Sequence, residues 1–125
     1  MKLERRRKAE VHGRRSETLA ALFLACKLYR VIGRRVKTRA GELDLIALSP
    51  RGILCFVEVK ARSRETDAAE SVTPRQRRRI AHAARLYVGA RPGLRHKGVR
   101  FDSILVAHGR WPLHLKDAWR PDALD

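Results

Sequence analysis

Residues 41–62 carry the clearest pattern of hydrophobic and polar positions in the chain. Two apolar runs, at residues 43–48 and 53–59, flank the turn sequence Ser-Pro-Arg-Gly at residues 49–52. Short apolar runs bounded by proline and glycine are typical of strands joined by a tight turn. The pattern therefore predicts a β-hairpin at the centre of the fold.

Charged side chains interrupt both predicted strands: Glu42, Asp44, Glu58 and Lys60. Because strand side chains alternate between two faces, Glu42 and Asp44 share one face of the first strand, and Glu58 and Lys60 share one face of the second. If the strands pair, all four groups can meet on one side. Clustered carboxylates lose hydration and repel one another, so they persist only with a cation, a proton or basic partners.

A divalent metal ion is the natural partner for such a cluster. Asp44 and Glu58 offer the oxygen ligands that suit Mg²⁺ or Mn²⁺, which bind through one or two carboxylates, waters and substrate phosphate oxygens. Lys60 would then lie beside the ion, where it could orient or deprotonate an attacking water and stabilise charge on the phosphate. Glu42 has a second interpretation, an ion pair with one of the many arginines.

The order of an acid in one strand, a turn, and Glu-x-Lys in the next strand resembles the PD-(D/E)xK nucleases, which have the restriction-endonuclease-like fold. The sequences Gly-Glu-Leu-Asp-Leu-Ile-Ala from Gly41, Phe-Val-Glu-Val-Lys-Ala-Arg from Phe56, and Arg-Phe-Asp from Arg100 look like the small bacterial YraN-type proteins, uncharacterised protein family 0102. Those proteins are similar in turn to archaeal Holliday-junction resolvases. The resemblance extends from about Gly13 to Trp119 and implies a central mixed sheet flanked by helices.

The spacing of Leu19, Leu22, Phe23 and Cys26 predicts an amphipathic helix over residues 16–29. Glu17 lies in its first turn, where an acid complements the helix macrodipole. The resemblance adds a second interpretation, in which Glu17 faces the strand carboxylates as a further ligand for the metal or for water.

Basic side chains flank the hairpin on both sides. Residues 30–40 predict an edge strand, whose basic residues, Arg39 among them, either protect the edge from aggregation or guide a phosphodiester strand. Arg62 and Arg64 continue beyond Lys60 into a polar loop over residues 63–72. They are candidates for phosphate contacts and equally for solvated charges.

A second helix is predicted from Thr73 to about Gly89. Thr73 is suited to the N-cap, a proline follows at the first helical position, and Gln76 has the spacing of a capping-box partner. The resemblance gives Gln76 an alternative role near the active site. Arg75 and Arg78, on the polar surface of this helix, are candidate nucleic-acid contacts.

The C-terminal part predicts a strand over residues 99–107 and a short strand over 111–115, followed by a segment in which Trp119 packs against the body. Asp102 near the start of the first of these strands is interpreted as an ion-pair partner of Arg100. The resemblance adds a supporting role near the sheet for Asp102.

The charge of the chain indicates what kind of partner the protein binds. With 29 Lys and Arg against 13 Asp and Glu, the formal net charge is +16, which favours a polyanionic partner. Nucleic acid, most of all DNA, is the leading candidate. A basic protein without such a partner is the alternative.

The N-terminal segment has two interpretations. We expect residues 1–15 to be a mobile basic leader, residues 16–120 one domain, and residues 121–125 a frayed tail. The apolar run at residues 19–26 also resembles a short lipoprotein signal sequence, although Glu17 and Thr18 suit such a segment poorly. Without a long apolar stretch we expect no membrane span and a cytoplasmic location, where both cysteines, Cys26 and Cys55, would be buried thiols.

These observations favour a Mg²⁺- or Mn²⁺-dependent nuclease acting on DNA, with a site composed of Asp44, Glu58, Lys60, Glu17 and Gln76. Branched or junction DNA follows from the resemblance alone, and symmetric cleavage of a junction would need a homodimer. The alternative is a nucleic-acid-binding protein that retains the nuclease fold but cuts nothing.

Overall fold

A computed structural model describes the backbone of residues 2–62 and 72–121, and their side chains from Gly13 onward except that of Arg62. Within these residues the chain forms a five-stranded sheet and two helices. The elements are α1 (Lys2–Cys26), β1 (Arg30–Thr38), β2 (Gly41–Leu48), β3 (Leu54–Arg62), α2 (Pro74–Gly89), β4 (Val99–Ala107) and β5 (Leu113–Trp119). The predicted hairpin is therefore confirmed as β2 and β3.

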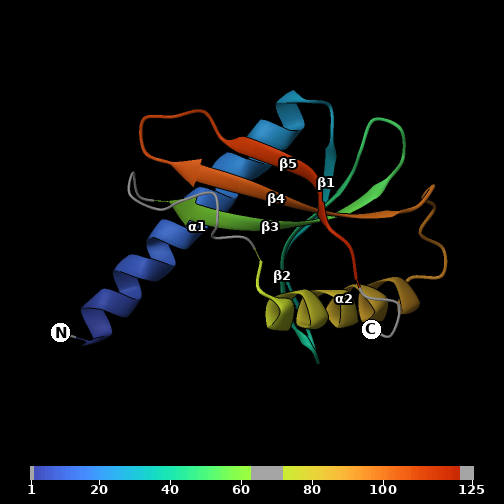
Figure 1. Cartoon of the computed structure of the whole chain (residues 1–125), viewed down its shortest axis with the longest axis horizontal. Helices are drawn as coiled ribbons and strands as arrows, with labels where there is room; N and C mark the ends of the chain where they lie inside the picture. Colours follow the sequence, from blue (N-terminus) through green and yellow to red (C-terminus); the bar gives the residue numbers. More distant parts are fainter. Residues whose placement is uncertain (1, 63–71, 122–125) are drawn as a thin grey trace.

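The strands are ordered β1-β2-β3-β4-β5 across the sheet. Neighbouring strands are antiparallel except β3 and β4, which run parallel and are connected through α2. Figure 1 shows α2 lying across the end of β2, while α1 passes behind β3 and β4. This mixed α/β architecture is consistent with a restriction-endonuclease-like fold, as predicted.

Hydrophobic side chains fill the two faces of the sheet separately. Phe56 of β3 packs with Tyr87 of α2, their ring centroids 5.9 Å apart, in a cluster on one face. Val57, the next residue, belongs to the other cluster, together with Ala20 and Leu24 of α1. This alternation along β3 is the reason that a strand buried on both faces appears as a continuous apolar run.

The first helix is longer than the sequence pattern predicts. The leader expected at residues 1–15 is helical from Lys2, and α1 ends at Cys26 rather than at residue 29. Residues 2–12 consist largely of Lys, Arg, Glu, Leu and Ala, which have high helix propensity, and they contain no proline. A basic segment of this composition can therefore extend a helix already anchored by its later turns.

The predicted buried face of α1 is also wrong. Ala20 and Leu24 are fully buried against the sheet, whereas Leu19 and Leu22 are 51% and 59% exposed. Small side chains such as alanine allow a helix to approach a sheet closely, and this contact was not apparent from the stripe of larger residues. Cys26 shares the exposed face, so only Cys55 is the buried thiol that we expected.

The N-terminal cap of α2 is confirmed in detail. The backbone N–H of Gln76 donates to Thr73 Oγ1 at 3.2 Å, and the backbone N–H of Thr73 donates to Gln76 Oε1 at 3.0 Å. Pro74 occupies the first turn, where its missing N–H costs nothing. The helix buries Ile80 and Tyr87, as its pattern predicts.

The last strand differs from its prediction. It spans Leu113–Trp119 rather than residues 111–115, because the closing segment continues the pairing with β4. Trp119 is buried and stacks on Phe101, with ring centroids 4.4 Å apart. The aromatic closure is thus confirmed, although it belongs to a strand.

Candidate metal site

The predicted acids meet where β2 and β3 stop pairing. The pairing of β2 with β3 ends at Leu45 opposite Val57, so Asp44 and Glu58 are the next residues along the two strands. Asp44 Oδ2 accepts a hydrogen bond from the backbone N–H of Val59 at 2.9 Å. Since β3 continues to pair with β4 as far as Arg62, the sheet opens between β2 and β3 at this point. We call this opening the fork.

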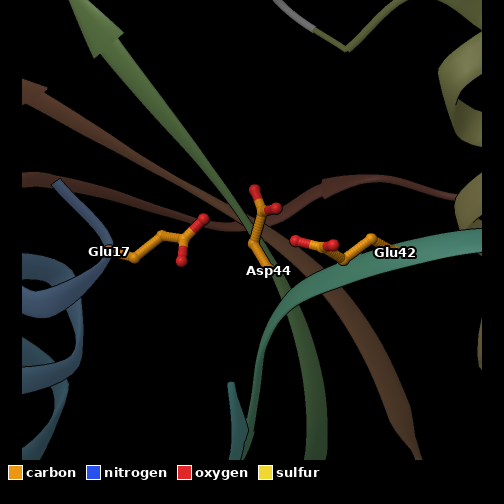
Figure 2. Close-up of side chains that lie close together, drawn as sticks. All are labelled: Glu17, Glu42 and Asp44. Atoms are coloured by element: carbon orange, nitrogen blue, oxygen red, sulfur yellow. The ribbon is translucent and has the colours of Figure 1, made fainter. Parts of the chain in front are cut away.

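Three carboxylates from two elements converge at the fork. One oxygen each of Glu17, Glu42 and Asp44 lies within 4.8 Å of the others. Figure 2 shows the carboxylate groups of Glu17, from α1, and Glu42, from β2, directed toward Asp44 between them. Glu17, which had two interpretations from sequence, therefore faces the strand acids.

Glu58 joins this cluster through Asp44. The two carboxyl groups share a hydrogen bond, which requires that one of them carry a proton. Burial and then the charge of Asp44 raise the pKa of Glu58 to about 7, so Glu58 is the group that holds the proton. Burial also raises the pKa of Asp44, against the lowering effect of the Val59 N–H. The cluster is short of positive charge.

Glu17 shows the same shortage most directly. It is 8% exposed, and its Oε2 has no hydrogen-bond partner among the described residues. Burial, followed by the charge of Asp44, raises the pKa of its carboxyl group. A buried carboxylate oxygen that receives no hydrogen bond is only partly compensated for its lost hydration. Oxygen ligands arranged in this way fit Mg²⁺ or Mn²⁺, which would supply the missing charge.

Lys60 is the predicted cation at the site. Its Nζ lies 3.7 Å from Glu58 Oε1, and its side chain is 25% exposed. This position confirms that Glu58 and Lys60 project from β3 on the same side. The Lys60 side chain is therefore partly accessible from solvent.

Sequence reasoning missed two arginines at the fork. Arg35 Nε lies 3.3 Å from Glu42 Oε1 and 3.7 Å from Glu17 Oε2. Arg79 of α2 is close enough to lower the pKa of Glu58, although burial dominates that shift. Both compensate the carboxylates in part.

The hairpin register explains the place of Arg35. Arg34 lies opposite Leu45 and Val36 opposite Leu43, so Arg35 is opposite Asp44. The tight turn between Thr38 and Gly41 sets this register, and it was the signal that could have identified Arg35. Its φ of 49° is unusual for a residue other than glycine, and such backbone strain often occurs at functional sites.

Gly41 gives Arg79 room to approach. Gly41 has a φ of +138°, and a Cβ atom at this position would lie 2.9 Å from Arg79 Cδ. The stem of Arg79 therefore lies directly over the start of β2. A glycine immediately before Glu42 was the signal in the sequence for this close contact.

The other predicted site residues lie elsewhere or outside the described residues. Gln76 Oε1 is engaged in the capping box, which supports the structural interpretation, and its role at the site stays a prediction. Arg39, Arg75 and Arg78 are exposed, and their contact with nucleic acid stays a prediction. Only the backbone of Arg62 is described, and Arg64 lies outside the described residues.

Asp102 forms a second polar centre, apart from the carboxylate cluster. Its side chain is fully buried and receives both Nε and Nη2 of Arg100 at 2.8 Å, in a bidentate ion pair. His114 Nε2 lies 2.8 Å from Asp102 Oδ2, and the backbone N–H of Asp117 donates at 3.0 Å. The predicted ion pair is confirmed, and the centre also fixes β5 to β4.

This second centre extends to the C-terminal end of α1. Lys27 Nζ lies 2.7 Å from His114 Nδ1, and Arg100 Nη2 donates to the hydroxyl of Tyr29 at 2.8 Å. Burial, more than any nearby charge, lowers the pKa of Lys27. Since α1 also carries Glu17, this network holds in place the helix that brings Glu17 to the fork.

Neither helix in the described part of the chain combines the length and hydrophobicity that crossing a membrane requires.

Known proteins of several bacteria are similar to this chain over most of its length. A UPF0102 protein of Parvibaculum lavamentivorans is 50% identical over 109 residues, covering 87% of this chain and 81% of the relative. One from Maricaulis maris is 47% identical over 117 residues, covering 93% and 91%, respectively.

A UPF0102 protein of Paramagnetospirillum magneticum is 46% identical over 119 residues and 91% of both chains. The model of the uncharacterised protein family UPF0102 matches residues 16–106. This match includes Glu17 and the whole of β2 and β3, so the elements that form the fork lie inside the family's shared region. The chain belongs to the uncharacterised protein family UPF0102.

Proposed function

We propose that this protein is a metal-dependent phosphodiester hydrolase that acts on DNA. One observation carries the proposal: one carboxylate oxygen each of Glu17, Glu42 and Asp44 lies within 4.8 Å of the others, and the buried Glu17 Oε2 has no hydrogen-bond partner among the described residues. An acidic cluster alone is common. A buried carboxylate oxygen that receives no hydrogen bond and only a 3.7 Å ion pair from Arg35, beside a carboxyl pair that must hold a proton, is the arrangement that a divalent cation compensates.

Asp44 is the central ligand in this proposal, since its carboxyl group lies close to those of Glu17 and Glu42 and shares a hydrogen bond with Glu58. Glu17 would approach the ion from α1, and Glu58 would approach from β3 after losing its proton. Glu42 would have a supporting position, because Arg35 already neutralises part of its charge. When bound, Mg²⁺ or Mn²⁺ supplies Lewis-acid chemistry, drawing charge from phosphate oxygens and making nearby water more acidic.

Lys60 would act on the reacting phosphate. Its ammonium group, 3.7 Å from Glu58, can donate hydrogen bonds to a phosphate oxygen or position a water molecule for attack. The carboxyl group of Glu58 holds the lysine in place. Arg79 adds positive charge from the α2 side, where developing negative charge on phosphorus would be stabilised.

The net charge of +16 supports DNA as the substrate, because each neutralised phosphate releases counterions. Exposed Arg75 and Arg78 lie on α2, which also carries Arg79 at the fork. Junction DNA is a narrower possibility that follows from similarity to junction resolvases, and it would require a homodimer to cut two strands symmetrically.

A second candidate is a binding protein that retains the nuclease fold without cutting. The raised pKa of Glu58, to about 7, favours this candidate. A protonated Glu58 carries no negative charge, so the carboxylates at the fork repel one another less when no metal is bound. The two candidates differ in what Lys60 does. For a nuclease, Lys60→Ala should abolish cleavage and spare binding, whereas for a binding protein it should alter neither measurement.

The deciding experiment is incubation of the purified protein with labelled duplex, single-stranded and four-way-junction DNA in Mn²⁺, Mg²⁺ or EDTA. We expect metal-dependent cleavage that falls by at least about 100-fold in Asp44→Asn and Lys60→Ala. Asp117→Asn is the matched control, since Asp117 is an exposed acid paired with Arg120. Binding without cleavage under every metal condition would contradict the nuclease proposal and favour the binding protein.

A further inference from the structure

An open groove lies between α1 and the turn that connects β4 to β5. Its volume is about 560 Å³. The apolar part of its lining includes Leu19 of α1, Val106 of β4, and Trp111 and Pro112 of the turn. A groove of this size can hold a flat aromatic group of a ligand.

Trp111 is the unusual member of this lining. It is 86% exposed, whereas Trp119, the other tryptophan of the chain, is buried. Among the described residues no aromatic ring or hydrogen-bonding group contacts its side chain. Across the groove, Leu19 is 51% exposed, so the helix face that sequence analysis expected to be buried is instead open beside Trp111. Contiguous exposed apolar surface of this kind marks an interaction site.

The groove is bordered by positive charge. Arg15, His108 and Arg110 all line it, and exposed Arg14 precedes Arg15 on α1. No carboxylate lines the groove within the described residues. An exposed indole ring in a groove that also has guanidinium groups suits a ligand that has flat aromatic surfaces and regularly spaced negative charges. Nucleic acid with unpaired bases has both features, whereas in a duplex the faces of the bases are stacked away.

We propose that this groove binds single-stranded nucleic acid, with one unpaired base stacked on Trp111 and the adjacent phosphates held by Arg15 and Arg110. The choice of nucleic acid as the ligand rests on charge complementarity. The inference deepens the proposed function, on which it rests for its biological meaning, by specifying a substrate that carries unpaired bases.

Helix α1 connects the groove to the fork. On α1, Ser16 lines the groove and the adjacent Glu17 belongs to the carboxylate cluster. On the sheet, the groove begins at Val106, whose side chain belongs to the hydrophobic cluster that packs against α1. The groove and Glu17 are therefore both built on this helix.

Binding in EDTA separates this inference from catalysis. We would measure the anisotropy of a labelled oligothymidylate and of a matched oligonucleotide made of abasic sites, which keeps the phosphates and lacks the bases. The intact protein should bind the oligothymidylate more tightly. Trp111→Ala should weaken this binding by roughly 5- to 100-fold and remove the preference over the abasic strand, while Trp111→Phe should retain most of both.

Leu22→Ala is the control, because Leu22 is another exposed apolar residue, on α1 and outside the groove, and the substitution should leave binding unchanged. Equal affinity of Trp111→Ala and the intact protein for the oligothymidylate would overturn the inference. Sedimentation of the same proteins tests a second copy as the occupant: a dimer that dissociates in Trp111→Ala, without a change in binding, would also overturn it. Asp44→Asn should bind normally, so a protein that stacks bases but cuts nothing would contradict only the proposed function.

Discussion

The carboxylate of Asp44 accepts a hydrogen bond from the backbone N–H of Val59, 2.9 Å away, at the point where β2 and β3 separate. A side chain thus replaces the backbone carbonyl that would continue the ladder. The contact satisfies a buried donor and, at the same time, fixes one Asp44 oxygen. An oxygen of the same carboxylate lies within 4.8 Å of Glu17 and Glu42.

This double role predicts different effects for two substitutions of Asp44. Asp44→Asn keeps an acceptor for Val59 and removes the negative charge that repels Glu17, so its melting temperature in EDTA should equal or exceed that of the intact protein. Asp44→Ala leaves the N–H unsatisfied, which costs about 1–3 kcal/mol. Thermal denaturation of both variants measures the difference. A lower melting temperature for Asp44→Asn than for Asp44→Ala would contradict this role.

Divalent cations should stabilise the protein through the carboxylate cluster. A ligand that binds only the folded state adds about 2.7 kcal/mol to the free energy of unfolding at 100 times its dissociation constant. Titration with Mn²⁺ or Mg²⁺ should therefore raise the melting temperature of the intact protein. The rise should be lost in Asp44→Asn and reduced in Glu17→Gln.

The control for this titration is Asp117→Asn, which removes an acid outside the cluster and should keep the full rise. An equal rise in the intact protein and in Asp44→Asn would place the metal elsewhere.

The ion pair of Asp102 with Arg100 should stabilise the fold strongly. Asp102→Asn would leave Arg100 without its bidentate partner in a largely buried setting, and breaking a buried pair in this way costs about 3–5 kcal/mol. Chemical denaturation measures the loss. A change below about 1 kcal/mol would show that the network around Asp102 contributes little.

The pH dependence of this contribution follows from the pKa of Asp102. Burial alone would raise it, but hydrogen bonds from His114, Arg100 and the Asp117 N–H outweigh burial and lower the pKa to about 2. The unfolded chain therefore takes up the proton first as the pH falls below its ordinary pKa of 3.8. The stability advantage of the intact protein over Asp102→Asn should be complete above about pH 4 and should decline toward pH 2. An advantage that is constant across this range would contradict the assignment.

Gly41→Ala should disturb the fork from the α2 side. An alanine would be strained at a φ of +138°, and its Cβ would lie 2.9 Å from Arg79 Cδ. Strain of this kind costs about 1–3 kcal/mol, and the displaced Arg79 should reduce any cleavage activity further. Thermal denaturation and the DNA cleavage assay measure the two effects.

Gly89→Ala is the matched control, because no atom lies within 4 Å of a Cβ at that position and its backbone is helical. This substitution should leave stability unchanged or raise it by up to about 1 kcal/mol. A comparable loss in both variants would indicate a general effect of removing glycine.

Local pattern predicted much of this protein. The apolar runs around Ser49–Gly52 indicated the hairpin, and Thr73 with Gln76 indicated the start of α2, because turn and cap chemistry act over a few residues. Asp44, Glu58 and Lys60 stood out for the same reason, as charges inside segments that favour burial. The side of α1 that faces the sheet was predicted wrongly, since Ala20 and Leu24 rather than Leu19 and Leu22 make that contact.

The sequence by itself determined the strands, the caps and the charged positions, since these depend on side-chain period, backbone conformation and burial cost. Only the tertiary structure decided which groups meet: Glu17 with Asp44 from elements far apart in the chain, Arg35 opposite Asp44, and His114 with Asp102. Such contacts depend on the rotation of a helix about its axis and on the register between strands. Many weak packing and hydrogen-bonding interactions across the fold set both together. For the same reason the groove that Leu19 and Trp111 line could be recognised only in the assembled structure.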